Sequence, residues 1–389
     1  MNPIPPGAWL GLLGGGQLGR MFCMAAQSLG YKVIVLDPGS DSPAGSVADR
    51  HLQAAYLDPD ALAQLAAVAR AATTEFENVP AAALEFLARN GRVTPAAASV
   101  AIAQDRISEK MFLSGHGFAV APFALLRNAD DARNVDAALL PGIVKSARFG
   151  YDGKGQVSVR THEEVATAWH AMNGLPCVLE QRVTLACEIS VIVARNDHLD
   201  VATWPVAENI HRDGILDVSI VPARVAADLA QRARTIAMRV AATLDYRGVL
   251  CVEMFVAGDG SLLVNEIAPR PHNSGHYSID ACVTSQFEQQ ARVLADLPLG
   301  DTRQHTPAVM VNLLGDLWFD GPAAKHPREP AWHEVLAQPQ AKLHLYGKAE
   351  PRRGRKMGHV TCLGATLEAA IAAARAIKRT LHIPGAESI

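Results

Sequence analysis

The sequence predicts a mixed fold, α/β in its first third and α+β beyond it. Two observations support this prediction. Over residues 9–89, short apolar runs alternate with helical stretches, an order typical of a doubly wound parallel sheet. After about residue 106, strand-like segments follow one another closely, and Asp-Gly and Gly-Asp-Gly turns join some of them into hairpins.

The N-terminal region is expected to begin with a β-α-β unit. Residues 9–13 form an apolar run, a glycine cluster follows, and a helical stretch continues to about residue 29. Residues 31–36 form a second strand, which ends at the turn signal Asp37-Pro38-Gly39. Helical stretches at 60–70 and 81–89 flank a third strand at 72–76, which runs into Glu75 and Glu77. Ligands bind at the carboxyl ends of parallel strands, so the glycine cluster and this acidic pair should face one crevice.

The second region should consist mainly of strands, with one long helix. A short helical stretch at 109–114 leads into strands at 142–145, 157–159, 177–181, 188–194 and 199–205. Hairpins are expected at 208–221, around Asp213-Gly214, and at 249–267, around Gly258-Asp259-Gly260, with an amphipathic helix at 226–244 between them. The proline-rich residues 320–330 should link this region to a last part, which contains an Ala-rich helix at 366–380.

The composition excludes several classes of protein. The 389 residues leave room for two or three domains, and a content of 49% hydrophobic and 19% charged residues is typical of packed domains. A formal charge of −3 offers no general attraction to nucleic acid or to an anionic membrane. No apolar run reaches the roughly 18 residues of a membrane helix, the N-terminus does not resemble a signal peptide, and the six cysteines form no C-x-x-C pair. We expect a soluble, cytoplasmic protein.

The glycine cluster GGGQLG at residues 14–19 satisfies G-x-G-x-x-G between a strand and a helix. Asp37 follows at the end of the next strand, where a dinucleotide site would place its ribose-binding acid. The physical basis is general, because backbone N–H groups at a helix N-terminus bind anions of many kinds. The motif therefore favours a phosphate ligand without identifying it, and a tight turn that only packs helix against strand stays an alternative.

A second glycine-rich motif, GYDGKGQ at residues 150–156, begins five residues after Lys145. A glycine-rich hairpin tip with one lysine can fold over the phosphates of a nucleotide while Lys145 neutralises them from the side. The alternative is a surface hairpin that is glycine-rich for no functional reason.

The hairpin at residues 249–267 brings two glutamates together. If Val256 pairs with Ser261, Glu253 lies opposite Val264, and Glu266 lies diagonal to Glu253 on the same face. Their carboxylates could then converge on one cation, and Mg²⁺ in nucleotide sites uses a few carboxylates together with phosphates. Asn265 would point to the other face but could contribute an oxygen after slight distortion. Two exposed glutamates on a solvated sheet face are the alternative.

Polar and basic residues follow this hairpin in two groups. The first crowds one loop with a cation, two imidazoles and neutral donors, which suits an anion pocket: Arg270, His272, Asn273, Ser274 and His276. The second places five cations within nine residues: Lys348, Arg352, Arg353, Arg355 and Lys356. A solvated basic loop would explain the second group equally well, and the lack of interleaved aromatic residues argues against a nucleic-acid patch.

Together these motifs resemble ATP-grasp enzymes, and specifically the 5-(carboxyamino)imidazole ribonucleotide synthases. The resemblance extends from GGGQLGRM at residues 14–21 to GRKMGH at 354–359, and GYDGKGQ and PRPHNSGH (269–276) are specific to that family. One position departs from it, since Arg353 stands where relatives often have proline. This change should loosen the turn and add a cation but leave Arg355 and Lys356 in place.

The resemblance implies a reaction and a domain plan. The reaction is the ATP-dependent carboxylation of the exocyclic amine of 5-aminoimidazole ribonucleotide with bicarbonate, through carboxyphosphate, in de novo purine synthesis. The implied cofactors are ATP and Mg²⁺, without nicotinamide, flavin or biotin, and the implied assembly is a homodimer. The plan is an N-terminal pre-ATP-grasp domain at residues 1–105, an ATP-grasp domain at 106–300 with a lid at about 115–183, and a C-terminal domain at 301–389 that packs on it.

The resemblance also implies the roles of individual residues. Glu180 and the backbone after it would hold adenine, Glu188 the ribose, and Glu253 and Glu266 the Mg²⁺ ion. The full set of implied ATP contacts is Arg106, Lys145, Gly150, Tyr151, Asp152, Gly153, Lys154, Gly155, Gln156, Glu180, Gln181, Arg182, Val183, Glu188, His211, Asn265 and Glu266. Substrate contacts would come from Gln17, Leu18, Glu75, Asn273, Ser274 and Lys356. The implied catalytic residues are Tyr151, Asp152, Arg270, His272, Lys348 and Arg355.

The reaction explains these residue types. Bicarbonate is a poor electrophile, so ATP must activate it, and phosphoryl transfer depends mainly on positioning and charge neutralisation. Carboxyphosphate hydrolyses in water, so a lid should close over it. Asp152, helped by Tyr151, is the candidate to take the amine proton. Whether the amine attacks carboxyphosphate or released carbon dioxide stays open at this point.

Three other classes of protein are weaker interpretations. A nicotinamide-dependent oxidoreductase would use residues 14–19 and Asp37 but leaves the second glycine motif and the paired glutamates unexplained. Another ATP-grasp ligase, such as a formate-using glycinamide ribonucleotide transformylase or a biotin carboxylase, would not be expected to carry GYDGKGQ and HNSGH. A catalytically dead ATP-binding regulator would be expected to lack a charged residue of the site, and none is missing.

Overall fold

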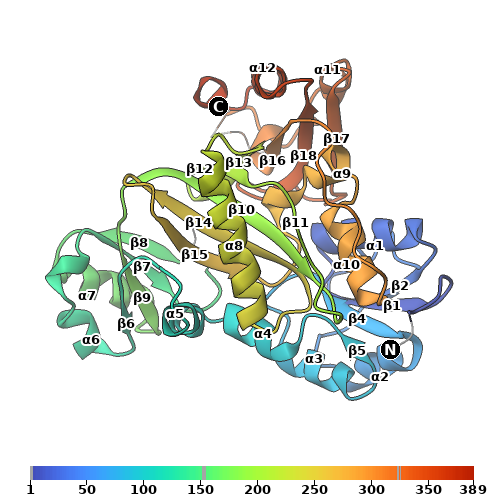
Figure 1. The fold of residues 1–389 in the computed structure, drawn as a ribbon, viewed down its shortest axis with the longest axis horizontal. Helices are drawn as coiled ribbons and strands as arrows, with labels where there is room; N and C mark the ends of the chain where they lie inside the picture. Colours follow the sequence, from blue (N-terminus) through green and yellow to red (C-terminus); the bar gives the residue numbers. More distant parts are fainter. Residues whose placement is uncertain (1–2, 151–154, 322–323, 325) are drawn as a thin grey trace.

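The N-terminal sheet contains five parallel strands in the order β3-β2-β1-β4-β5 (Figure 1). The computed structural model describes residues 3–150, 155–321, 324 and 326–389. The strands are β1 (Trp9–Leu13), β2 (Lys32–Leu36), β3 (Arg50–Leu52), β4 (Ala71–Thr74) and β5 (Arg92–Val93), and helices α1 (Gln17–Ser28), α2 (Pro59–Val68) and α3 (Ala81–Ala88) lie between them. Helix α2 begins where the sequence signals it, because Asp58 caps the N–H of Ala61 and Pro59 is the first helical residue. The predicted doubly wound sheet is confirmed.

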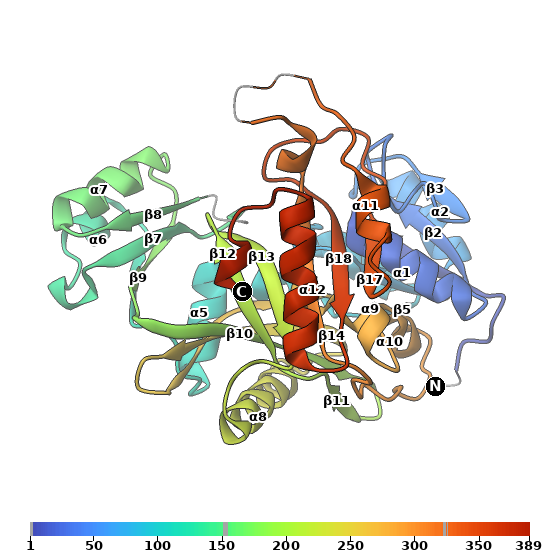
Figure 2. The same cartoon turned by 90° about the horizontal axis from the view of Figure 1, so that it is seen from above.

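Two helices lead from this sheet to a small antiparallel domain. These are α4 (Ala97–Ala103) and α5 (Arg106–Gly115). The four-stranded sheet beyond them, in the order β6-β9-β7-β8, consists of β6 (Phe123–Leu126), β9 (Cys177–Gln181), β7 (Gly142–Ser146) and β8 (Gln156–Val159). Its outer layer holds α6 (Ala129–Arg133), η1 (Ala137–Leu139) and α7 (His162–Ala171). Figures 1 and 2 show this domain, the lid, on the side of the molecule opposite the N-terminal sheet.

A nine-stranded antiparallel sheet lies between these two parts. Eight of its strands follow the order β15-β14-β10-β12-β13-β16-β18-β17, and β11 pairs with β10. Their bounds are β10 (Leu185–Arg195), β11 (Val201–Thr203), β12 (Ala207–Arg212), β13 (Ile215–Val221), β14 (Gly248–Ala257), β15 (Leu262–Ala268), β16 (Ala308–Leu314), β17 (Ala341–Leu345) and β18 (Lys356–Leu363). Since β13 pairs directly with β16, the C-terminal segment extends the central sheet.

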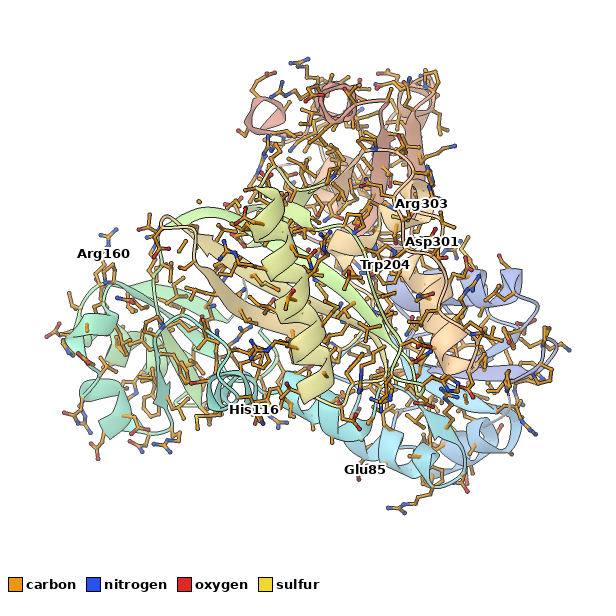
Figure 3. The ribbon with its side chains drawn as sticks, in the orientation of Figure 1. Glu85, His116, Arg160, Trp204, Asp301 and Arg303 are labelled. Carbon is orange, nitrogen blue, oxygen red and sulfur yellow. The ribbon has the colours of Figure 1, made fainter. Side chains whose placement is uncertain are left out.

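Helices cover both faces of the central sheet. Helices α8 (Ala227–Thr243), on β10 and β14, and α12 (Leu367–Thr380), on β16 and β18, cover one face. Helix α10 (Gln286–Leu294) packs on β10 and β14 from the other face. The remaining short elements are η2 (Asn273–Gly275), α9 (Ser278–Ala281), η3 (Gly315–Trp318), α11 (Trp332–Leu336) and η4 (Ala386–Ser388). Side chains such as Trp204 are fully buried, and its indole N–H donates to the carbonyl of Thr284, while Arg160 projects from the lid (Figure 3). Within the described residues, no helix has the length and apolar character to cross a membrane.

The register of the β14–β15 hairpin differs from the prediction. Val256 pairs with Leu262 and not with Ser261, because Gly258-Asp259-Gly260 form a three-residue loop with Gly260 at a φ of 79°. A β-bulge then adds Asn265 as an extra residue on β15, so that Glu253 lies directly opposite Glu266. The predicted diagonal arrangement was wrong, but the two glutamates are closer neighbours than expected.

Candidate active site

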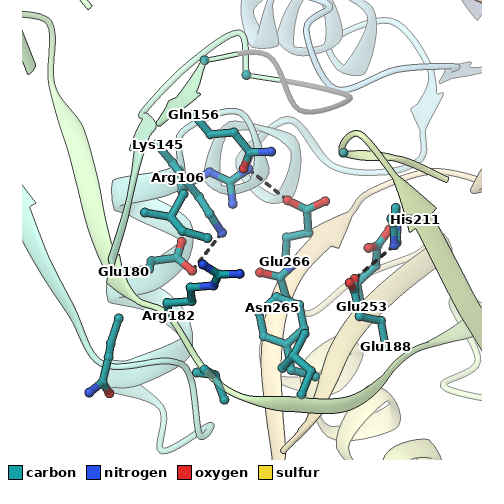
Figure 4. A pocket seen from close by; sticks show the side chains of 18 of the residues that line it. Arg106, Lys145, Gln156, Glu180, Arg182, Glu188, His211, Glu253, Asn265 and Glu266 are labelled. Atoms are coloured by element: carbon teal, nitrogen blue, oxygen red, sulfur yellow. Dashed lines mark hydrogen bonds and ion pairs between the residues drawn. The ribbon is translucent and has the colours of Figure 1, made fainter. Parts of the chain in front are cut away.

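A cavity of about 810 Å³ opens between the lid and the central sheet. Strands β7 and β9 supply its lid side, and β10, β12, β14 and β15 supply its floor (Figure 4). It brings together many of the predicted nucleotide and metal contacts, namely Arg106, Lys145, Gly150, Gly155, Gln156, Glu180, Gln181, Arg182, Val183, Glu188, His211, Glu253, Asn265 and Glu266. Tyr151, Asp152, Gly153 and Lys154 lie outside the described residues.

Two lysines hold one carboxylate at the lid end of the cavity. Glu180 on β9 accepts from Lys145 on β7 at 3.0 Å, and Lys110 on α5 lies 3.3 Å from the same oxygen. Burial would raise the pKa of Glu180, but Lys145, Lys110 and Arg106 together lower it below its usual range. The other oxygen, Oε1, is buried and has no partner within the described part of the chain. Glu180 is therefore an ionised side chain with one free acceptor.

Two carboxylates and an amide define the opposite end. Arg106 donates to Glu266 at 2.9 Å, and His272 Nε2 lies 2.9 Å from Glu253. Burial raises the pKa of Glu266, but the charges of Arg106 and Lys145 outweigh it and hold the pKa at about 2. Asn265 Oδ1 is buried without a hydrogen-bond partner among the described residues. Two carboxylates and one unused amide oxygen form the set of oxygen donors that Mg²⁺ prefers, so these residues fit that ion.

The floor of the cavity also holds an ion pair between neighbouring strands. His211 on β12 lies 3.1 Å from Glu188 on β10. Burial would lower the pKa of His211, but the hydrogen bond and charge of Glu188 raise it above its usual value. The pair can therefore present both a donor and an acceptor to a ligand.

The glycine cluster after β1 contacts a carboxylate of this same chain. Both oxygens of Glu75, which follows β4, accept backbone N–H groups, from Gly16 at 2.6 Å and from Gly19 at 2.8 Å. A Cβ atom on Gly16 would lie 2.4 Å from Glu75 Oε1, so this glycine permits the close approach. Burial raises the pKa of Glu75, and the hydrogen bonds from the two N–H groups oppose this rise only in part. In this structure Glu75 therefore occupies these two donors, and a phosphate ligand at the glycine cluster stays a prediction.

The neighbouring sequence candidates lie at the same crevice but differ in availability. Gln17 is the first residue of α1, and the Leu18 side chain is packed into the hydrophobic core. Asp37 accepts the phenol of Tyr56 at 2.6 Å and the N–H of Gly39 at 2.8 Å. The carboxylate that resembled a ribose ligand thus already has two internal partners.

The loop after β15 lies between these two regions. Arg270 forms a short ion pair with Glu77, which joins the loop to the N-terminal domain. The backbone N–H of Ser274 lies 3.3 Å from His272 Nδ1. Because an N–H group can only donate, the ring proton is assigned to Nε2, which donates to Glu253. His272 is therefore placed to donate from Nε2 to Glu253.

Buried polar partners hold this loop in place. The amides of Asn273 and Asn312 bond to each other at 3.0 and 2.7 Å. Ser190 donates to Ser274 at 2.7 Å, and Gln286 binds both the N–H and the carbonyl of His272. The predicted substrate residues Asn273 and Ser274 are thus buried and bonded within the protein.

The predicted basic loop follows β17. Lys348 donates to the carbonyl of Lys356 at 2.6 Å and lies over the Tyr346 ring, and Arg355 donates to the carbonyl of Glu350 at 2.7 Å. A Cβ atom on Gly347 would lie 3.5 Å from the guanidinium of Arg20 on α1. The loop therefore approaches the N-terminal domain at the side of the crevice.

Sequence reasoning missed several residues that organise the site. Lys110 is fully buried and also donates to the backbone carbonyl of Asn265 at 2.9 Å, so it links the two ends of the cavity. Glu109 on the same helix accepts the N–H of Ile267 at 2.6 Å. The charged pair Glu109-Lys110 within an otherwise amphipathic helix was the available signal. The roles of Gln286 and Asn312 had no signal in the sequence, since both act on residues distant along the chain.

Three domain models match the chain in sequence order. They are the ribonucleotide synthetase preATP-grasp domain at residues 8–104, the ATP-grasp domain at 111–287 and the phosphoribosylaminoimidazole carboxylase C-terminal domain at 308–373. With the lid, the lysine-lined cavity and the paired glutamates, these matches define the class of protein: an ATP-grasp ligase.

Similar proteins define the family more narrowly. The N5-carboxyaminoimidazole ribonucleotide synthase of Brucella melitensis is 48% identical over 92% of this chain and 97% of its own length, and that of Bacillus subtilis is 44% identical over 92% of each. A solved ADP complex of an N5-carboxyaminoimidazole ribonucleotide synthetase is 41% identical, with a TM-score of 0.91 over 98% of each chain. The Aspergillus clavatus enzyme, solved with ADP and 5-aminoimidazole ribonucleotide, is 30% identical, with a TM-score of 0.86 over 97% of this chain and 99% of its own.

The chain belongs to the N5-carboxyaminoimidazole ribonucleotide synthase family. It is an ATP-dependent ligase that carboxylates 5-aminoimidazole ribonucleotide in purine biosynthesis. The resemblance found in the sequence motifs is confirmed.

Proposed function

We propose that ATP lies in the cavity with its adenine at Glu180–Val183 and its phosphates between Lys145, Arg106 and the paired glutamates. The observation that supports this placement is the separation of charge in the cavity. One end offers an unused acceptor on Glu180, which suits the amino group of adenine. The other end offers Glu253, Glu266 and the unused oxygen of Asn265, which suit Mg²⁺. When bound, Mg²⁺ would neutralise phosphate charge during phosphoryl transfer.

The second substrate, 5-aminoimidazole ribonucleotide, is proposed to bind in the crevice between Glu75 and the loop that carries Arg270 and His272. Arg270 is largely buried and paired with Glu77, so it offers a fixed cation without a large entropy cost. Lys348, Arg355 and Lys356 come from the loop that approaches α1 and would supply positive charge for the phosphate of the ribonucleotide. The assignment of Asp152 and Tyr151 to the amine proton rests on the family resemblance alone.

The proposed chemistry proceeds through carboxyphosphate. A bicarbonate oxygen attacks the γ-phosphorus, ADP leaves, and Lys145 and Arg106 stabilise the charge on the transferred group. The amine then attacks the carbonyl carbon, and the bond between that carbon and the bridging oxygen breaks. The bridging oxygen, which came from bicarbonate, therefore leaves with inorganic phosphate.

Isotope transfer tests this route. Turnover with ¹⁸O-labelled bicarbonate should produce inorganic phosphate with one ¹⁸O atom per molecule, read by mass spectrometry. An otherwise identical reaction with labelled water and unlabelled bicarbonate is the control and should leave the phosphate unlabelled. Phosphate that takes its oxygen from water would show that ATP is hydrolysed without activating bicarbonate.

We further propose a cytoplasmic homodimer. A groove of about 440 Å³ lies between α1, α10 and β17, with Met24 51% and Leu345 38% exposed beside it. Strand β17 ends the central sheet, so one of its edges has unpaired backbone groups that a second copy can cover. Light scattering should give twice the chain mass, and Met24→Glu should reduce it to one chain, whereas Met111→Glu, an equally exposed methionine on α5, should not.

A further inference from the structure

Three side chains beside the cavity combine sulfur, nitrogen and oxygen donors at one point. Cys251 and Glu253 lie two residues apart on β14, so they share one face of the strand. His272 approaches that face from the loop after β15, with Nε2 2.9 Å from Glu253. The three ligand atoms, Cys251 Sγ, a Glu253 oxygen and a His272 nitrogen, all lie within 4.8 Å of one another.

This donor set does not suit Mg²⁺, which prefers oxygen ligands. Zn²⁺ binds Cys, His and carboxylate side chains at about 2.0–2.3 Å, and many sites combine three protein ligands with one water. At nitrogen and sulfur ligands, Zn²⁺ is also favoured over harder divalent ions. We propose that Cys251, Glu253 and His272 form a Zn²⁺ site that competes with Mg²⁺ for Glu253 and inhibits the enzyme when occupied. The competition, but not the Zn²⁺ site itself, rests on the proposed role of Glu253 in binding Mg²⁺.

Neighbouring hydrogen bonds can support these ligands. Metal binding at Nε2 requires the ring proton of His272 to move to Nδ1, and Ser274 Oγ lies 2.9 Å from Nδ1, ready to accept it. Ser190 donates to the same hydroxyl. Burial raises the pKa of the Cys251 thiol, and the Ser274 side chain opposes that rise. When the Nδ1–H group of His272 and the hydroxyl of Ser190 both donate to Ser274 Oγ, the Ser274 hydroxyl can donate its own hydrogen bond to the thiolate of Cys251. Such partners orient metal ligands and raise their affinity.

The proton balance of this step is simple. The thiol proton of Cys251 leaves for solvent when the Zn–S bond forms, and the imidazole retains its single proton on the other nitrogen. No oxidant or reductant is needed.

A second group of metal-ligating residues has a less suitable geometry. Asp280, His344 and His359 also have ligand atoms within 4.8 Å of one another. The rings of His344 and His359 are stacked, however, at 4.5 Å and 13°. Imidazole lone pairs lie in the ring plane, so two stacked rings direct them along nearly parallel planes and not toward one ion.

Cobalt absorption tests the Zn²⁺ site directly. Co²⁺ added to the full-length protein should produce the near-ultraviolet charge-transfer band of a Co–thiolate bond, and Zn²⁺ should remove that band. The band should disappear in Cys251→Ala and persist in Cys187→Ala, a control that removes the one cysteine that is not buried. Co²⁺ bound only to the carboxylates would give no such band. A wild-type protein without the band, or a band that survives in Cys251→Ala, would overturn the site.

Inhibition tests its consequence. Zn²⁺ should inhibit turnover of the wild-type enzyme, with relief by excess Mg²⁺. Cys251→Ala should need at least about tenfold more Zn²⁺ for the same inhibition, and its turnover without Zn²⁺ should stay within about twofold of wild type, since the thiol contacts no proposed substrate. Equal sensitivity of the two proteins would contradict the inhibitory role. A Cys251-dependent cobalt band in a protein that fails to turn over 5-aminoimidazole ribonucleotide would retain the Zn²⁺ site and reject the proposed function.

Discussion

Replacing Glu75 by alanine removes the anion that the glycine cluster binds in this structure. The carboxylate is buried and accepts the N–H groups of Gly16 and Gly19 at 2.6 and 2.8 Å. Hydrogen bonds to a charged group contribute roughly 1.5–3 kcal/mol each. Burial raises the pKa of Glu75, which shows that the charged form also loses hydration, so the lower value applies to each bond. We therefore expect Glu75→Ala to destabilise the first turn of α1 by about 3 kcal/mol.

Amide hydrogen exchange measures this loss locally. A cost of about 3 kcal/mol corresponds to a roughly 100-fold faster exchange of the amides in residues 16–20, because every 1.4 kcal/mol is a factor of ten. Glu75→Gln keeps one acceptor oxygen and should show about half the loss in kcal/mol. Added formate should slow exchange again in Glu75→Ala and have no effect on wild type. Unchanged exchange in Glu75→Ala would refute the role of the carboxylate as an internal cap.

Four further substitutions test the site. Glu253→Gln or Glu266→Gln should each lower turnover by about 100-fold or more at all Mg²⁺ concentrations while the circular dichroism spectrum is retained; near-normal turnover would remove the paired carboxylates from the metal site. Gln17→Ala should raise the KM for 5-aminoimidazole ribonucleotide about tenfold and leave that for ATP unchanged; an equal rise in both would place Gln17 outside the substrate crevice. Burial raises the pKa of Glu109 to about 7 from 4.5, so its stabilising contribution is present below pH 4.5 and lost as the pH rises to 7. In urea denaturation, the free energy of unfolding of Glu109→Gln relative to that of wild type should therefore rise by at most about 3 kcal/mol between pH 5 and pH 8. A difference that does not depend on pH would contradict this.

Local patterns predicted most elements because the features that define them lie close together in the sequence. Strand β9 and the helix after Thr366 are found where apolar runs and a capping residue indicate them. The β14–β15 register could not be predicted, because the choice between a three- and a four-residue loop depends on Gly260 adopting a positive φ. The bulge at Asn265 is also not visible in the alternation of apolar and polar residues along the strand. The Glu253/Glu266 pair was nevertheless found, since both registers put the two glutamates near each other.

Partners distant in the sequence account for what was missed. The G-x-G-x-x-G pattern correctly predicted a strand, a tight turn and a helix, but it could not reveal that Glu75, 59 residues from Gly16, occupies the N–H groups. Likewise the pairing of β13 with β16, which makes the C-terminal part an extension of the central sheet, joins strands whose patterns are individually ordinary. The role of Lys110 could not be predicted either, because its partners, Glu180 and the carbonyl of Asn265, lie on the distant strands β9 and β15.

The most direct test of the account is ATP turnover by the purified full-length chain with Mg²⁺, measured as ADP and phosphate release. Release should be fast only when 5-aminoimidazole ribonucleotide and bicarbonate are both present, and it should accompany formation of the carbamate of the exocyclic amine in equal amount. Omission of either substrate should leave only a slow background. Rapid turnover with formate and glycinamide ribonucleotide, and none with 5-aminoimidazole ribonucleotide and bicarbonate, would contradict the account.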